Sequence, residues 1–170
     1  EDLSEAEKET LFKQVGYGAI KYFLLKVSPQ KSMMFDPKAS IDFIGNTGPF
    51  IQFNFVRAKS VLRKSEELHG ALNASTLNES VWDQTELRII QLGLHWPNVL
   101  KQSASECDPS LIANHCYEFT KAYSRWYQDH PILQVEDESL RVARKTICHF
   151  FTQQVEDAMG LLGIQMPERM

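Results

Sequence analysis

Residues 49–64 combine three phenylalanines with four basic side chains and contain no acidic residue, in a chain whose net charge is −4. These side chains are Phe50, Phe53, Phe55, Arg57, Lys59, Arg63 and Lys64. Cations attract phosphates, and aromatic rings stack unpaired bases for about 1–3 kcal/mol each, so the stretch favours binding of single-stranded nucleic acid. An alternative stays open, because aromatics at helical spacing also form cores and cations also form solvated helix faces.

The histidines and cysteines form no motif typical of a metal or catalytic site. CxxC and HExxH are absent, and the neighbouring pairs His115-Cys116 and Cys148-His149 diverge by roughly 100° on a helix, so neither pair can face one ion. The sequence also lacks a G-x-S-x-G turn and a phosphate-binding loop. We therefore predict packing or surface roles for these residues, and no catalytic residue, metal or cofactor in this chain.

The bulk properties indicate one globular domain covering residues 1–170. A content of 43% hydrophobic and 24% charged residues is typical of a folded protein rather than a disordered one. No apolar run approaches the ~20 residues of a membrane span, and no signal peptide is visible, so we predict a cytoplasmic protein with three reduced cysteines. The chain opens with Glu1 rather than Met, and we expect it to be a piece of a longer protein.

Helix-start signals divide the first half of the chain. Ser4 and Glu7 form a capping box for a helix that runs to about Ser28-Pro29, and Asp36-Pro37 predicts a short helix over 37–43. The turn Gly45–Pro49 then begins another helix. Its expected core positions are Ile51, Phe55, Ala58 and Leu62, with Phe50 undecided. The small and polar residues 69–81 predict a loop.

The second half shows the same signals. Asp83 with Glu86 predicts a helix start, followed by an apolar stripe at Leu87, Ile90, Leu94 and Leu100. Asp108-Pro109 begins a helix that ends before His130-Pro131, and the last helix runs from about Asp137 to Leu162. Their apolar stripes are Ile112, Cys116, Phe119, Ala122, Tyr123 and Trp126, then Leu140, Ala143, Ile147, Phe150, Phe151, Val155, Ala158 and Leu162. Strand-like alternation is absent, so we predict an all-α helical bundle.

Three segments, in the same order, resemble the C-terminal anticodon-binding (DALR-type) domain of arginyl-tRNA synthetases. They are Val15–Leu25, Phe43–Phe53 with Arg57 following, and Pro167–Met170. The resemblance implies the helical bundle of class I aminoacyl-tRNA synthetases and recognition of the anticodon stem-loop. It also implies that the catalytic half, which carries the HIGH- and KMSKS-type motifs, lies outside this chain.

What the resemblance implies about function extends to the whole enzyme. The parent would be an arginine–tRNA ligase that uses ATP with Mg²⁺ to attach arginine to its tRNA. This fragment would bind arginine tRNAs and pack on its own catalytic domain, as a monomer with no membrane contact. The open alternatives are the helical domain of another class I synthetase, such as the cysteine or methionine enzyme, a helical protein-interaction module without RNA, and a helical metalloenzyme.

The family's anticodon pocket maps onto particular residues of this sequence. Phe53, Arg57 and Met170 match its aromatic, arginine and terminal methionine, and Phe53 replaces the family's tyrosine, so the hydroxyl donor is missing. Asn46, in the turn before the helix, and Gln52 complete the predicted anticodon contacts. We predict contacts to the tRNA backbone from Lys59, Arg63 and Lys64.

Overall fold

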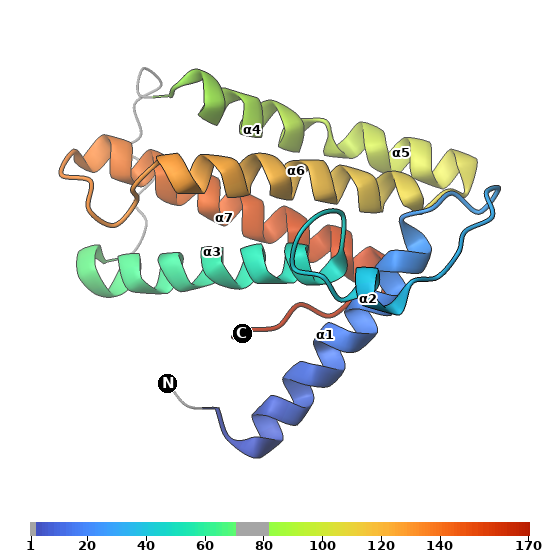
Figure 1. The fold of residues 1–170 in the computed structure, drawn as a ribbon. Helices are drawn as coiled ribbons and strands as arrows, with labels where there is room; N and C mark the ends of the chain where they lie inside the picture. Colours follow the sequence, from blue (N-terminus) through green and yellow to red (C-terminus); the bar gives the residue numbers. More distant parts are fainter. Residues whose placement is uncertain (1–2, 71–81) are drawn as a thin grey trace.

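The computed structural model describes residues 3–70 and 82–170, and this part of the chain contains seven α-helices and no strand. The helices are α1 (Glu5–Leu25), α2 (Pro37–Ser40), α3 (Gly48–His69), α4 (Gln84–Leu94), α5 (Trp96–Glu106), α6 (Ser110–Asp129) and α7 (Glu138–Leu161). Figure 1 shows them as a single bundle, which confirms the predicted all-α fold. No helix in the described ranges has the length and apolarity needed to cross a bilayer.

The predicted caps are present at most helix starts. Ser4 and Glu7 form the capping box of α1, and Asp83 and Glu86 form that of α4. At the start of α3 the sequence predicted the turn but not the cap, in which the hydroxyl of Thr47 accepts a hydrogen bond from the N–H of Phe50. Such caps stabilise a helix end by about 1 kcal/mol each, so local sequence alone sets these boundaries.

Two predicted boundaries in the first half differ from the structure or lie outside it. Asp36 caps α2 as predicted, but the helix ends at Ser40 instead of reaching residue 43. The predicted loop 69–81 falls mostly outside the described residues, which stop at Gly70. Gly70 itself ends α3 with φ of +75°, a backbone conformation that favours glycine.

The middle of the bundle is formed by α6 and α7, with α4 and α5 on one side and α3 on the other. The core contains most of the predicted apolar positions of α6 and α7, but not Leu140, and the rings of Tyr123 and Phe151 stack with centroids 3.8 Å apart. Ile51 and Phe55 of α3 are also fully buried, as predicted. Phe50, which was undecided, is partly buried and packs edge-on against Tyr117 of α6, with 5.8 Å between ring centroids.

The predicted apolar stripe of α4 is wrong by one position. The helix buries Glu86, Ile89 and Gly93, whereas Leu94 is 67% exposed. The carboxylate of Glu86 points inward because it accepts hydrogen bonds from Trp126 Nε1 (3.3 Å) and Arg144 Nε (3.2 Å). Because Glu86 occupies a core position, the buried positions of α4 are offset by one residue from the predicted apolar stripe. The helix break at His95 also prevents the stripe from continuing unbroken into α5.

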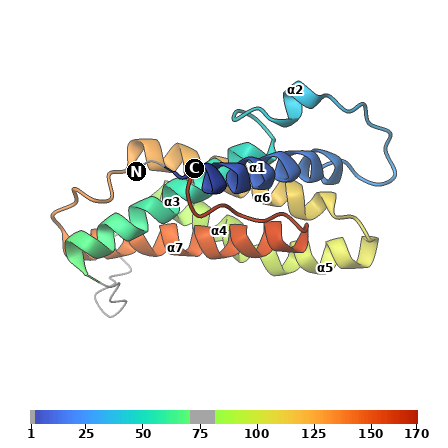
Figure 2. The same ribbon diagram turned by 90° about the horizontal axis from the view of Figure 1, so that it is seen from below.

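Helix α1 crosses α3 at a pair of glycines. A Cβ atom on Gly48 would lie 2.8 Å from the carbonyl oxygen of Gly18, closer than real Cβ contacts allow. The two backbones therefore touch where α3 begins. Figure 2 shows the chain after α7 returning alongside α1 and ending near α3, so the C-terminal tail, residues 163–170, lies beside this crossing.

Candidate nucleic-acid interface

An open groove of about 680 Å³ runs between α3 and the C-terminal tail. We call it the α3 groove and define it by Phe53, Arg57, Arg63, Lys64 and Met170. Four of the five lie within about three turns of α3, and Met170 comes from the far end of the chain. Five of the eight predicted site residues therefore line one hollow of the surface.

Arg57 is held in place by residues of α3 and α6. Its Nη2 donates hydrogen bonds to Asn54 Oδ1 (2.7 Å) and Ser124 Oγ (3.2 Å), and its guanidinium carbon lies 4.3 Å from the ring centroid of Tyr127. The Phe53 ring lies on the groove side at 5.6 Å. The buried Nε of Arg57 has no hydrogen-bond partner among the described residues. The guanidinium is thus fixed on its Nη2 side and retains donors for a ligand.

Phe53 presents an accessible ring at the groove edge. It is 44% exposed, and Phe43, from the segment before α3, meets it edge-on with centroids 6.3 Å apart. Phe43 is itself about half exposed. Sequence reasoning did not single out Phe43 as a site residue, although its aromatic type beside a turn was the available signal.

The C-terminal tail is fastened so that Met170 reaches the groove. The fully buried Gln52 donates through Nε2 to the carbonyl oxygens of Gln165 (3.0 Å) and Gln14 (3.3 Å), and thus joins α3 to the tail and to α1. Arg63 Nη1 donates to the carbonyl of Glu168 at 3.4 Å. The predicted ligand contact of Gln52 is corrected here, because a side chain with no exposed surface positions the tail instead.

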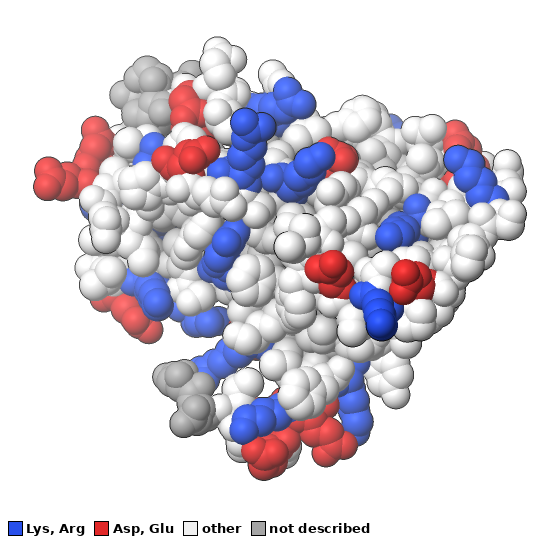
Figure 3. Space-filling model, in the orientation of Figure 1, with Lys and Arg blue, Asp and Glu red and all other residues white. Residues whose placement is uncertain are grey.

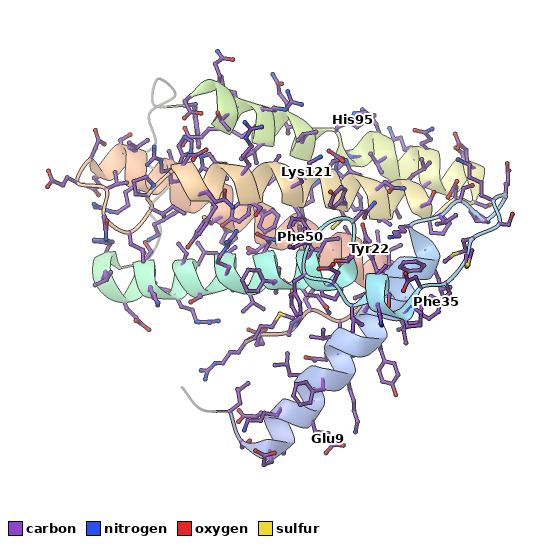
Figure 4. All side chains as sticks on the ribbon, viewed as in Figure 1. Glu9, Tyr22, Phe35, Phe50, His95 and Lys121 are labelled. Atoms are coloured by element: carbon purple, nitrogen blue, oxygen red, sulfur yellow. The ribbon has the colours of Figure 1, made fainter. Side chains whose placement is uncertain are left out.

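Asn46 also departs from its predicted role. Its Oδ1 accepts a hydrogen bond from the hydroxyl of Tyr22 (2.6 Å), and its Nδ2 donates to Asn114 Oδ1 (3.0 Å). Figure 4 shows Tyr22 at this junction, where α1 meets the start of α3. Asn46 is not among the residues that line the α3 groove, and its polar atoms are used to join α1, the turn and α6.

The predicted phosphate contacts separate into two groups. Arg63 and Lys64 line the groove, but Lys59 turns toward α7, where its Nζ lies 3.5 Å from Glu156 Oε2 and 5.2 Å from the Phe55 ring. Periodicity on one helix could not reveal this, because the acidic partner comes from a different helix. Lys59 is therefore not among the residues that line the α3 groove.

The cysteines and histidines occupy packing positions in the described structure. Cys116 and Cys148 are buried, and burial raises the pKa of each thiol to about 12, which leaves neither a nucleophile at neutral pH. Burial, with a smaller effect of His95, lowers the pKa of His115 to about 4. His115 stacks between Trp96 and Phe119, with centroid distances of 5.5 Å and 6.3 Å.

One cluster of possible metal ligands, Asp83, Glu86 and His130, was not anticipated from the sequence. Its atoms already bond one another and the core: His130 Nε2 lies 2.7 Å from Asp83 Oδ2, and Glu86 accepts from Trp126 and Arg144. Burial works against ionisation of Asp83, but hydrogen bonds from the Glu86 backbone and from His130 outweigh it and lower the pKa of Asp83. These contacts explain the cluster as a structural one.

Comparisons with known proteins identify the family of the chain and proteins with the same fold. The family model described as the DALR anticodon binding domain matches residues 51–170. The arginine–tRNA ligases of Phocaeicola vulgatus and Flavobacterium psychrophilum are 43% and 40% identical over 99% and 100% of this chain, which spans 28% of the length of each. The solved Thermus thermophilus arginyl-tRNA synthetase superposes over 99% of this chain and 28% of its own, with a TM-score of 0.90 and 26% identity. Because the family model covers well over half of the chain, including the five residues that define the α3 groove, the chain belongs to the DALR anticodon binding domain family.

Proposed function

We propose that this chain is the anticodon-binding domain of an arginine–tRNA ligase, and that the α3 groove holds unpaired bases of the anticodon loop of arginine tRNAs. The observation that carries the proposal is the fixed guanidinium of Arg57 beside the half-exposed ring of Phe53. The family match and the arginine-specific relatives favour this assignment over the cysteine or methionine enzymes.

Each groove residue has a distinct role in this proposal. An anticodon base splayed out of its loop stacks on Phe53, and Arg57 donates from Nη1 to an acceptor on the base edge. Met170 supplies an apolar and adaptable wall. Because Phe53 has no hydroxyl, base discrimination must come from Arg57 rather than from the aromatic residue.

The remaining parts of the proposal concern the tRNA backbone and the parent enzyme. Arg63 and Lys64 attract loop phosphates along the groove, which predicts affinity that falls steeply with salt. Attachment of arginine, with ATP and Mg²⁺, takes place in the portion of the ligase outside this chain. The ligase that contains this domain is a monomer in this proposal.

The test compares two cations of α3, one inside the groove and one outside it. We expect Arg57→Ala to remove about 1–3 kcal/mol of preference for a cognate anticodon stem-loop over loops with substituted anticodon bases. Lys59→Ala is the matched control and should preserve that preference, because Lys59 faces Glu156. Competition binding with the substituted loops measures both. An Arg57→Ala protein that retains full preference would show the pocket assignment to be wrong.

A further inference from the structure

The C-terminal tail brings Met170 to the α3 groove with little support from its own backbone. The N–H of Ile164 donates to the carbonyl of Met159 (2.9 Å), a bond that belongs to the end of α7. Beyond it, residues 165–168 make no hydrogen bond between backbone groups in the described part of the chain. Because neither a helix nor a sheet fixes the path of the tail, side-chain contacts must set the position of Met170.

The tail begins at a turn that is bonded to α1. Gly163 has φ of +67°, a conformation that favours glycine, and here the chain leaves α7 and returns along α1 (Figure 2). Lys21 of α1 donates from Nζ to the carbonyl oxygen of Gly163, across 142 positions of sequence. The donor is a cation, which strengthens the bond. The first residue of the tail is therefore held by α1.

A second attachment to α1 follows two residues later. The amide of Gln52 joins the carbonyl oxygens of Gln165 and Gln14, and a Cβ atom on Gly18 would lie 2.7 Å from its Nε2. Gln14, Gly18 and Lys21 are spaced by four and three residues, so they share one face of α1. This single face holds the tail at two successive points.

Apolar packing alone does not fix the tail along this face. Ile164 and Met166 pack against the core, but hydrophobic contact has no preferred direction. An open hollow of about 500 Å³ lies between α1 and residues 163–165, and Gly18 and Lys21 line it. Because the tail is not closely packed on α1 there, the directed hydrogen bonds decide where it lies.

We propose that Lys21 is a positioning residue for anticodon recognition. By holding the carbonyl of Gly163 it fixes, together with Gln52, the place of Met170 in the α3 groove. This inference rests on the proposed function, because it uses Met170 as the wall against the bound base. No residue of α1, which is described over its whole length, lines the α3 groove, so Lys21 acts on the base only through the tail.

The test removes the donor on α1 and measures anticodon preference in the full-length ligase, by competition between cognate and base-substituted stem-loops. Lys21 is exposed, so Lys21→Met leaves the core intact, and it should lower the preference about three- to tenfold, the scale of one lost hydrogen bond. Lys21→Arg keeps a cationic donor and should retain the preference. Lys13→Met is the matched control, because Lys13 is an exposed lysine of the same helix that bonds Glu9 at 2.7 Å.

A double-mutant cycle shows whether the effect passes through the tail. In a Met170→Ala background, Lys21→Met should change the preference by less than about twofold, because the side chain that it positions is already gone. A general loss of structure would lower the preference by the same factor in both backgrounds.

A measurement without RNA follows the tail itself. Met166, which is partly buried, is replaced by cysteine in a background in which the exposed Cys107 is serine. Lys21→Met should raise the alkylation rate of M166C about threefold or more, since a loosened tail opens more often, and Lys13→Met should leave the rate unchanged.

Three results would overturn the inference. They are an unchanged preference in Lys21→Met, equal losses in both backgrounds of the cycle, and an alkylation rate that does not rise. If an Arg57-dependent preference is present and Lys21→Met behaves like Lys13→Met, this inference fails alone. If Lys21→Met speeds alkylation but no preference depends on Arg57, the groove assignment fails, and the anticodon role of Lys21 fails with it.

Discussion

Two grooves of similar size on this domain differ in how their charged side chains are arranged. The α3 groove measures about 680 Å³, and a second groove of about 830 Å³ lies between α4 and α6. Both contain at least three cations. In the α4–α6 groove Arg88, Lys121 and Arg125 share the lining with two acidic residues, Glu118 and Asp129, whereas the lining of the α3 groove contains one, Glu67. Figure 3 shows basic and acidic side chains close together over α4 and α6.

The difference lies in organisation rather than in volume or in the number of cations. The α3 groove holds one guanidinium fixed by two hydrogen bonds, and it adds an exposed ring and a terminal methionine. The lining of the α4–α6 groove contains no aromatic residue. A loop with unpaired bases needs stacking surface as well as charge, so only the first groove suits it.

The largest expected effect is on the stability of the α4 side of the bundle, away from the α3 groove. Arg144→Leu leaves the fully buried Glu86 without its cationic partner, so the free energy of unfolding should fall by about 3–5 kcal/mol. The control Glu156→Ala removes an exposed ion pair and should cost at most about 1 kcal/mol. Urea unfolding of the two variants measures their free energies of unfolding. Similar losses of stability in both variants would contradict the structural role of the Arg144–Glu86 ion pair.

The next effect tests whether Arg57 must be held in place to read a base. Tyr127→Leu removes the ring beneath the guanidinium, and anticodon preference should fall by about 1 kcal/mol, whereas Tyr127→Phe keeps the ring and should keep the preference. Competition binding distinguishes the two proteins. If Tyr127→Leu lowers affinity equally for all loops, Tyr127 has only a structural role.

A further effect concerns acid stability on the α5 side of the bundle. Burial depresses the pKa of His115 to about 4, below the ordinary value of 6.5, so the unfolded chain binds this proton more readily. Stability should therefore decline as pH falls from 6.5 toward 4. His115→Phe keeps the stacking and should flatten this decline, as measured by urea midpoints across that range. An unchanged slope would show that His115 does not contribute to it.

Local signals predicted the framework of the fold but only part of the site. The caps at Ser4 and Asp83 depend on residues three positions apart, so these helix starts could be read directly. The i, i+4 spacing likewise placed Phe53 next to Arg57. The direction of Gln52 depends on the tail more than a hundred residues later, which no local pattern reveals.

The same distinction explains what sequence reasoning missed. Ser124 and Tyr127 reach Arg57 from α6, so their role depends on how two helices pack and not on their own neighbours. Glu86 is a charged residue at a core position, and hydrophobic periodicity assigns such a residue to the surface. In both cases a long-range contact outweighs the local preference.

The comparison of the two grooves leads to one direct measurement, the salt dependence of anticodon stem-loop binding. Arg63→Ala with Lys64→Ala should reduce the slope of log K against log salt by about 0.7 for each lost phosphate contact, because fewer counterions are released. Arg88→Ala with Arg125→Ala, in the α4–α6 groove, should leave the slope unchanged. A reduced slope in the second pair and an unchanged slope in the first would contradict the assignment of RNA binding to the α3 groove.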